Sequence, residues 1–260
     1  MKGRKWWQIP LGIPVLLLLW FAATRDGLVS PFVLAKPELV WRALVNQGTT
    51  GALWVDIGMT TYRALSGLLL SAIFGIPLGL FLGYVSQAYR HVALPLDIIR
   101  SIPSATLFPV FILAFGVGNA SKVAVVFYGC FFLIVMASIY GGRGTNDRPK
   151  RIQMVKSLRA TQSQVFRYVV LPDALPNILS GMRISASIAF VLVVVTEMFL
   201  GANNGLGKRI YDMYLSYRIP DLYADLLLLG LLGYFANAAV ERINRYLNPS
   251  AHAATSDRVS

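Results

Sequence analysis

Long runs of apolar residues dominate this chain and leave few folds open to it. A helix needs about 20 mostly apolar residues to cross the roughly 30 Å hydrocarbon core of a bilayer, and several runs here are that long. Only helices and closed barrels satisfy the backbone in hydrocarbon. Barrel strands alternate apolar and polar residues, whereas the run from Val123 to Ala137 does not alternate. The sequence therefore predicts an all-α membrane protein.

The apolar runs predict about six transmembrane helices. We expect them at residues 9–23, 60–84, 93–116, 121–140, 177–200 and 222–240. Residues 1–58 would hold the first helix and an outer amphipathic segment, residues 59–247 the main membrane domain, and residues 248–260 a disordered polar tail. The first segment also has the basic start and apolar core of a signal peptide. We favour a retained helix because the charges of the other segments are then consistent.

Three prolines interrupt the third expected span, namely Pro95, Pro103 and Pro109. Proline removes a backbone donor and kinks a helix. Broken helices at membrane depth often line cavities. We therefore expect this span to form part of the wall of a pore.

Charged residues are few and mostly basic. They make up 14% of the chain, with a formal net charge of +12, whereas a soluble domain carries about 25%. Cytoplasmic loops of membrane proteins collect Lys and Arg, and most basic residues fall on that side if both termini are cytoplasmic. The polar stretch 141–176 would then be cytoplasmic too. No soluble segment carries the basic stripe with interleaved aromatics that binding of nucleic acid requires.

The sequence offers no metal site and no catalytic constellation. Cys130 is the single cysteine, and His91 and His252 are far apart, so neither a disulfide nor a metal site is expected. The glycine-rich stretch 201–209 lacks the G-x-x-x-x-G-K-[ST] spacing of a phosphate-binding loop. A membrane-embedded enzyme would need clustered acids or a nucleophile with its base. We therefore expect no catalytic residue and no cofactor in this chain.

Small residues recur at every fourth position of the second expected span. They lie on one helix face, where another backbone can approach closely. This face is either a packing surface within the chain or the seam of a symmetric dimer. Its members are Gly67, Ser71, Gly75, Gly79 and Gly83.

The polar stretch 141–176 contains an amphipathic helix pair. Polar and basic residues occupy the faces that its apolar residues leave free, and Leu171-Pro172 would end the pair. Such a segment either lies at the lipid headgroups or docks a cytoplasmic partner. The apolar residues at helical spacing are Ile152, Val155, Leu158, Val165, Phe166 and Val169.

Several stretches in this region resemble a known family. Residues 157–161 (SLRAT), 165–176 (VFRYVVLPDALP) and 178–183 (ILSGMR) look like the coupling loop of bacterial ABC importer permeases. Three further stretches resemble the permeases of nitrate, sulfonate, taurine and bicarbonate importers, in family order and spacing. These are residues 75–79 (GIPLG), 100–104 (RSIPS), and 196–198 (TEM) followed by 205–207 (GLG).

The resemblance implies a fold, a location and a set of partners. A type I ABC importer permease would form the pore as a homodimer in the bacterial inner membrane, with a coupling helix between its fourth and fifth spans. Two cytoplasmic ATPase subunits would bind the ATP, and an outer solute-binding protein would deliver a small, anionic solute. The residues implied in ATPase coupling are Gln153, Lys156, Leu158, Arg159, Ala160, Phe166, Leu171 and Pro172.

Two positions depart from the family pattern. Gln153-Met154-Val155 stand where the family has Glu-Ala-Ala, and Arg159 replaces a glycine. Glycine allows a sharp bend between two short helices, whereas arginine favours a continuing helix. We therefore expect a straighter segment, or an ATPase with a matching acidic groove.

Polar residues within or beside the spans are candidates for the solute pathway. Ionisable residues at membrane depth usually face protein or water, and an anion needs donors such as Arg, Ser and Thr. Structural roles remain open for Arg183 and Glu197, as does a local ion pair with Asp97 for Arg100. The alternative function is a secondary transporter or channel that works without an ATPase. The candidate lining residues are Arg100, Ser101, Ser104, Arg183, Ser185, Ser187, Thr196 and Glu197.

Overall fold

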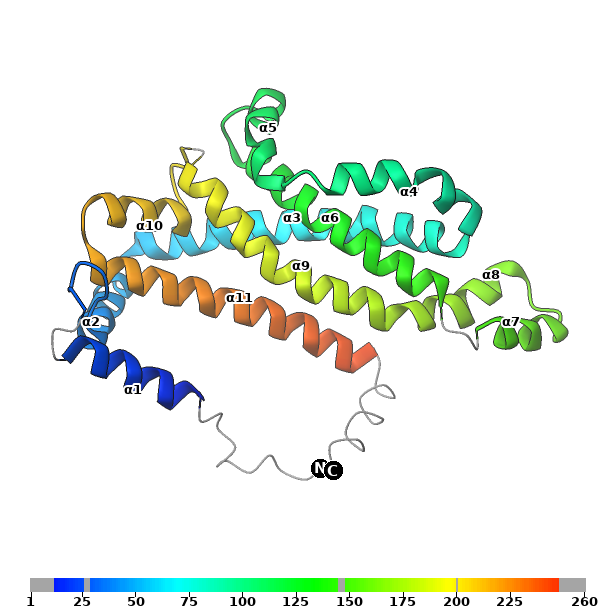
Figure 1. Ribbon diagram of the computed structural model, residues 1–260, viewed down its shortest axis with the longest axis horizontal. Coiled ribbons are helices and arrows are strands. Elements are labelled where there is room, and N and C mark those ends of the chain that lie inside the picture. The colour runs from blue at the N-terminus through cyan, green and yellow to red at the C-terminus, as the bar shows by residue number, and fades with distance from the viewer. Residues whose placement is uncertain (1–11, 26–28, 145–147, 200, 248–260) are drawn as a thin grey trace.

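The computed structural model describes residues 12–25, 29–144, 148–199 and 201–247 (Figure 1). The start of the first expected span and the polar tail lie outside these residues. Every regular element within them is helical, which confirms the prediction of an all-α fold. In chain order the elements are α1 (Gly12–Arg25), α2 (Pro37–Gly48), α3 (Gly51–Tyr84), α4 (Ser86–Arg100), a 3₁₀ turn (Ser104–Leu107), α5 (Phe108–Phe115), α6 (Asn119–Arg143), α7 (Arg148–Ser157), α8 (Gln162–Val165), a π turn (Phe166–Val170), α9 (Leu171–Phe199), α10 (Leu206–Leu215) and α11 (Ile219–Leu247).

Helix α6 is the centre of the bundle, because it packs along both α3 and α9 (Figure 1). Helix α11 packs along α9, and α2 lies against α11. Buried small residues let these helices approach closely, and Ala64 and Ala186 lie inside the main apolar cluster. In the same cluster the Cys130 thiol donates to the carbonyl oxygen of Ser185 at 3.4 Å.

The small-residue face of α3 is filled by α6. A Cβ on Gly67 would lie 2.6 Å from the Cβ of Val126, and one on Gly83 would lie 2.5 Å from the carbonyl oxygen of Ile139. Backbone and side chain are thus already in contact where a methyl group would have to fit. The hydroxyl of Ser71 donates across the same contact to a carbonyl oxygen of α6 at 2.9 Å. The face therefore serves packing within this chain.

We expect Gly83→Ala to lower the melting temperature of the purified protein by several degrees. The added methyl group must displace backbone of α6, and overpacking of this kind costs about 1–3 kcal/mol. Gly58→Ala is the matched control on the same helix, because no atom beyond its own helix turn lies within 4 Å of its Cβ position. Alanine there should be neutral or slightly stabilising. Equal melting temperatures for the two variants would contradict the close contact between α3 and α6.

Four helices among the described residues are long and apolar enough to cross a membrane, where the sequence predicts about six spans. They are residues 51–84, 119–143, 162–199 and 219–246. A fifth is present if α4 and the segment 104–115 count as one broken span. Helix α1 is described over only 14 residues, about 21 Å, which is less than the bilayer core requires.

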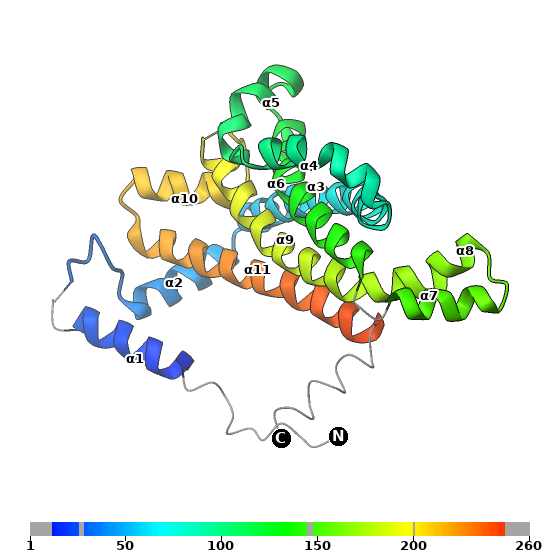
Figure 2. The same ribbon diagram turned by 45° about the vertical axis from the view of Figure 1, so that its right-hand side comes forward.

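The third expected span is sharply bent. Residues 86–100 and 104–115 meet at 78°, and Pro103 stands in the break between them. Pro95 lies inside α4 without ending it. Helices α4 and α5 lie on the side of the α3–α6–α9 core that is opposite α1 and α11 (Figures 1 and 2).

The expectation that Leu171-Pro172 ends the amphipathic pair is wrong. One helical segment continues from Gln162 to Phe199 through these residues. The π turn explains how the proline is accommodated, because the amide of Leu171 already bonds to the carbonyl oxygen of Phe166, five residues back. Pro172 has no N–H to place in this changed register.

Candidate functional site

Helices α7 and α8 project from one end of the bundle as a helix pair (Figure 2). We call residues 148–165 the knob. It comes between α6 and α9 in the chain, where the sequence predicts a helix pair outside the membrane. Its position leaves it few contacts with the rest of the fold apart from the base.

The two knob helices are separated by a tight bend at Arg159. This residue has a φ of 60°, in the left-handed region that costs a non-glycine residue roughly 1–2 kcal/mol. The amide of Arg159 bonds to the Lys156 carbonyl oxygen at 2.9 Å and that of Ala160 to the Val155 carbonyl oxygen at 3.4 Å, which is a Schellman ending. The expectation of a straighter segment is therefore wrong, and Arg159 adopts the bend for which glycine is best suited.

Helix α8 begins immediately after this bend with a capping box. The amide of Gln164 donates to the hydroxyl of Thr161 at 3.3 Å, and the amide of Thr161 donates to the side-chain oxygen of Gln164 at 2.8 Å. Together these two bonds satisfy amides that a helix start leaves without partners. They hold the bend in place from its C-terminal side, which offsets the cost of Arg159.

The tip of the knob exposes apolar side chains among polar ones. Met154 is 72% exposed and Leu158 is 80% exposed. Phe166, by contrast, is half-buried against Leu80 and Ala174. Of the residues implied in coupling, Gln153, Lys156, Leu158, Arg159 and Pro172 are exposed, whereas Ala160, Phe166 and Leu171 are half-buried.

Arg148 anchors the base of the knob. Its side chain is buried and donates to the carbonyl oxygens of Gly141, at 2.8 Å, and Gly142 at the end of α6. It also pairs with Asp173 of α9 at 3.1 Å, and Arg151 shares that carboxylate at 2.5 Å. The planar guanidinium suits several acceptors at once. One side chain thus joins the knob to α6 and α9.

A second buried network ties together the opposite end of the bundle. Arg63 of α3 and Glu197 of α9 form an ion pair at 2.5 Å, with side chains 3% and 0% exposed. Arg63 also donates to the side-chain oxygens of Asn119, at 2.9 Å, and Asn204, at 2.7 Å. One guanidinium therefore connects α3, α6, α9 and the turn before α10.

Glu197 has as many partners as Arg63. Its carboxylate accepts the hydroxyl of Thr60 at 2.8 Å and the amide of Gly207 at 2.9 Å. The Thr60 hydroxyl oxygen in turn accepts the amide of Leu206 at 2.8 Å. A buried charge is stable when it is paired and hydrogen-bonded in this way. The network fixes the start of α10 against the membrane helices.

Arg100 and Ser104 line one cavity of about 360 Å³ between the α4–α5 bend and α6. Tyr128 of α6 lies in the same wall, and its hydroxyl donates to the carbonyl oxygen of Ile99 at 2.5 Å. The guanidinium of Arg100 is half-exposed and pairs with Asp97 at 2.8 Å. The cavity therefore offers one cation and three hydroxyl groups, those of Ser104, Tyr128 and Tyr140, within an otherwise apolar wall.

The other candidate lining residues do not join this cavity. Ser101 and Ser187 are exposed, whereas Ser185 and Thr196 are buried within the bundle. Arg183 pairs with Glu241 of α11 at 2.9 Å. Glu197 belongs to the network with Arg63.

Arg63, Arg148 and Asp173 received no specific role from the sequence. Arg63 was detectable as a charge inside an apolar run, but its partner Glu197 is 134 residues away. Periodicity gives the face of a helix on which a residue lies and not the helix that it meets. Arg148 stands among many basic residues of the loop, so nothing in the sequence separates it from them.

The fold and these sites define a multi-pass helical membrane protein with a helix pair that projects between two spans. Residues 75–252 match the family described as the binding-protein-dependent transport system inner membrane component, and the chain belongs to this family. It is therefore an inner-membrane permease subunit of an ABC transporter and not itself the ATPase.

The relatives include permeases with named solutes. The putative aliphatic sulfonates transport permease of Bacillus subtilis is 29% identical over 95% of this chain and 88% of its own length. The taurine transport permease of Escherichia coli is 28% identical over 93% and 90%. The formylaminopyrimidine transport permease of Halalkalibacterium halodurans is 30% identical over 90% and 92%.

Solved structures share the fold. A chain of the inward-facing MetNI methionine ABC transporter matches with a TM-score of 0.65 and 22% identity, over 75% of this chain and 97% of that one. A second crystal form matches with a TM-score of 0.61 and 24% identity, over 82% and 99%. At these identities the likeness concerns the fold alone.

Proposed function

We propose that two copies of this chain form the pore of an importer for a small anionic solute of the sulfonate or taurine class. In this proposal each knob docks into one of two cytoplasmic ATPase subunits, and a solute-binding protein delivers solute at the opposite end. Both termini and the knob then face the cytoplasm. ATP-driven movement of the knobs would switch the pore between outward-open and inward-open states. Ligands that bind these two states with different affinities would bias the switch.

The exposed apolar tip of the knob carries this proposal. Exposed apolar groups rimmed by polar residues mark sites of protein interaction, and Leu158 lies at the outermost bend beside Lys156 and Arg159. A helix meant to lie flat at the headgroups would have no reason for a stabilised bend. The buried Arg148 anchor also supports docking, because it connects the knob rigidly to two membrane helices.

The proposed solute class rests on the donor groups in one cavity, which suit the solutes named for two of the relatives. Sulfonates and taurine each carry an anionic sulfonate group, for which a guanidinium and hydroxyls are suitable donors. Arg100, Ser104 and Tyr140 bring these donors to the cavity beside the bent span. We propose this cavity as part of the solute pathway.

Leu158→Asp is expected to weaken binding of the ATPase by about tenfold or more, since a charge would replace an apolar anchor at the interface. The measurement is co-purification of the ATPase with the permease at several salt concentrations. Because Leu158 is exposed, the melting temperature of the isolated permease should not change. Leu158→Met is the matched control, and it should retain binding because the side chain stays apolar.

Two results would overturn the proposal. One is ATPase binding to the aspartate variant that equals binding to the wild type. The other is solute uptake by vesicles that contain the permease and no ATPase, which would establish the secondary transporter or channel instead.

A further inference from the structure

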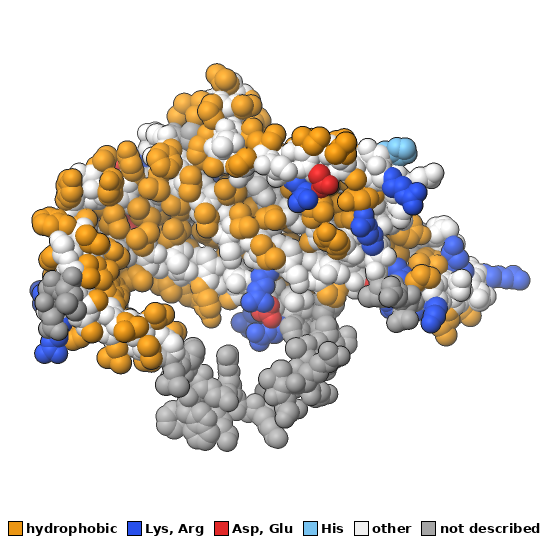
Figure 3. Space-filling view, viewed as in Figure 1, with side chains coloured by type: hydrophobic (Ala, Val, Ile, Leu, Met, Phe, Trp, Pro, Cys, Tyr) orange, Lys and Arg blue, Asp and Glu red, His pale blue; other side chains and the backbone are white. Residues whose placement is uncertain are grey.

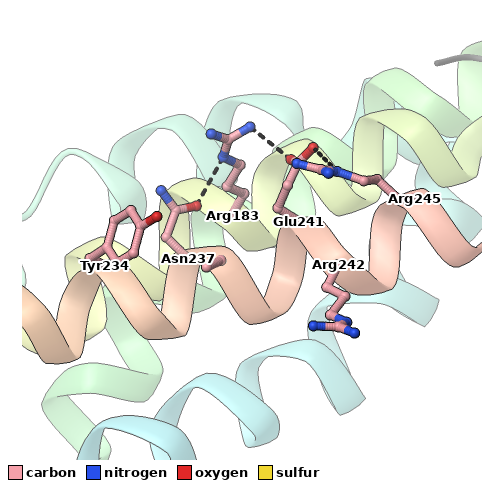
Figure 4. Close-up of a pocket in the computed structure, with 7 residues that line it drawn as sticks. Arg183, Tyr234, Asn237, Glu241, Arg242 and Arg245 are labelled. Atoms are coloured by element: carbon pink, nitrogen blue, oxygen red, sulfur yellow. Dashed lines mark hydrogen bonds and ion pairs between the residues drawn. The ribbon is translucent and has the colours of Figure 1, made fainter. Parts of the chain in front are cut away.

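A groove of about 560 Å³ lies between α9 and α11 (Figure 4), near the end of the bundle that bears the knob (Figure 1). Charged and polar side chains from both helices line it. Its polar lining residues are Arg183, Tyr234, Asn237, Glu241, Arg242 and Arg245.

The lining holds three guanidinium groups for one carboxylate. Arg183 donates to Asn237 at 2.9 Å and to Glu241 at 2.9 Å. Arg245 reaches the other oxygen of Glu241 at 3.4 Å. Glu241 thus orients two guanidiniums without neutralising the groove, and both remain accessible, with Arg183 52% and Arg245 70% exposed.

Several residues close in sequence to the groove residues are apolar and exposed. Phe235 and Ile243 of α11 and Ile184 of α9 are all exposed, and α11 is the least buried of the four candidate spans. In Figure 3 charged side chains over the C-terminal half of α11 form a patch beside hydrophobic and other uncharged groups. A charged patch bordered by apolar side chains near the end of a membrane helix is placed at the level of the lipid headgroups.

We propose that this groove binds the phosphate of an anionic phospholipid, with Arg183 and Arg245 as its main ligands. Guanidinium groups bind phosphate through paired hydrogen bonds, and basic pockets between transmembrane helices at the cytoplasmic side suit anionic headgroups. The exposed apolar residues beside the groove would contact the acyl chains. The translocated solute is a less suitable ligand, because the cavity with Arg100 lies on the opposite side of the core, next to α4 and α5.

The test measures phosphatidylglycerol that stays bound to the full-length permease when it is taken from mixed phosphatidylcholine–phosphatidylglycerol nanodiscs into detergent. Retained lipid is counted by native mass spectrometry. The double variant Arg183→Gln/Arg245→Gln should retain about tenfold less phosphatidylglycerol, because each arginine near an anionic lipid contributes substantially to its binding. Arg90→Gln/Arg143→Gln, with equal charge loss at exposed sites near the same end, should retain the wild-type amount.

Glu241→Gln should change phosphatidylglycerol retention in the opposite direction. Removal of the competing carboxylate should raise phosphatidylglycerol retention, an increase that a folding defect does not produce. Wild-type retention in the double arginine variant, or an equal loss in the Arg90→Gln/Arg143→Gln control, would overturn the proposal.

A competition arm separates lipid from a soluble anion. Inorganic phosphate at about 10 mM should not displace the bound lipid, and neither should taurine, because acyl-chain contacts add to the affinity of the lipid. Displacement by either would assign the groove to small anions and overturn the lipid proposal. The assignment to the cytoplasmic leaflet rests on the proposed orientation, whereas lipid retention does not, so ATPase binding and lipid binding can fail independently.

Discussion

Arg63→Met is expected to lower the free energy of unfolding by about 3–5 kcal/mol, the usual effect of removing one partner from a buried ion pair. The substitution leaves the carboxylate of Glu197 inside the bundle without its cation. It also leaves the side-chain oxygens of Asn119 and Asn204 without a donor. The measurement is thermal unfolding of the purified permease, where the fall in melting temperature should exceed that of Gly83→Ala.

Two further variants test whether the unpaired buried charge causes that loss of stability. Arg63→Met/Glu197→Gln removes the unpaired charge and should recover part of the stability. Arg218→Met removes an arginine of similar length from a half-exposed pair with Asp221, and exposed pairs contribute about 0–1 kcal/mol. Equal falls for Arg63→Met and Arg218→Met would show that the buried network does not stabilise the fold.

Arg148→Lys is expected to lower the amount of solute transported per ATP hydrolysed by about tenfold. Lysine keeps the charge but cannot reproduce the planar set of donors that reaches the end of α6 and Asp173. Each buried acceptor left without a donor costs about 1–3 kcal/mol, so the base of the knob should loosen. The measurement is solute transported per ATP hydrolysed in vesicles that contain permease, ATPase and binding protein.

Arg151→Lys is the control for that experiment, because Arg151 shares Asp173 but is half-exposed. It should leave the coupling ratio close to that of the wild type. Limited proteolysis gives an independent check, since a loosened knob in the Arg148 variant should be cleaved faster between α6 and α9. Unchanged coupling and unchanged cleavage in Arg148→Lys would remove the anchor role.

The class of the fold was predictable because long apolar runs indicate directly that the chain lies in a lipid bilayer. The break in the third expected span was also predictable, since Pro103 changes the local backbone whatever surrounds it. The number of spans was less accessible. Hydropathy counts apolar segments, whereas the length of each helix and the bend between α4 and α5 depend on tertiary packing.

The local conformation of the knob shows where propensity misleads. The helix propensity of arginine exceeds that of many other residue types by only a few tenths of a kcal/mol. That small preference was the basis for predicting a straighter segment. The Schellman bonds before Arg159 and the capping box at Thr161 together outweigh it. Similarly, the spacing of small residues on α3 indicated a contact surface, but only the structure shows that α6 fills it.

The pairing of distant residues could not be predicted at all. Gly83 and Ile139, or Arg63 and Glu197, meet because of the topology of the bundle, and a single sequence contains no record of that meeting. The cavity residues illustrate the same point. Arg100 and Ser104 are close in the chain and share a wall, whereas Arg183 and Ser187 lie elsewhere although their residue types suggested the same role.

The uninterrupted course of the chain from Gln162 to Phe199 makes α8, the second helix of the knob, and a membrane span one 38-residue rod, about 57 Å long. The bend that exposes Leu158 comes directly before one end of this rod, and the other end carries Glu197. We therefore expect a tilt imposed at Gln162 to shift the carboxylate of Glu197 relative to Arg63, as the two ends of a lever move together. Under the proposed function, a movement at the knob would then change the Arg63–Glu197 ion pair at the opposite end of the bundle.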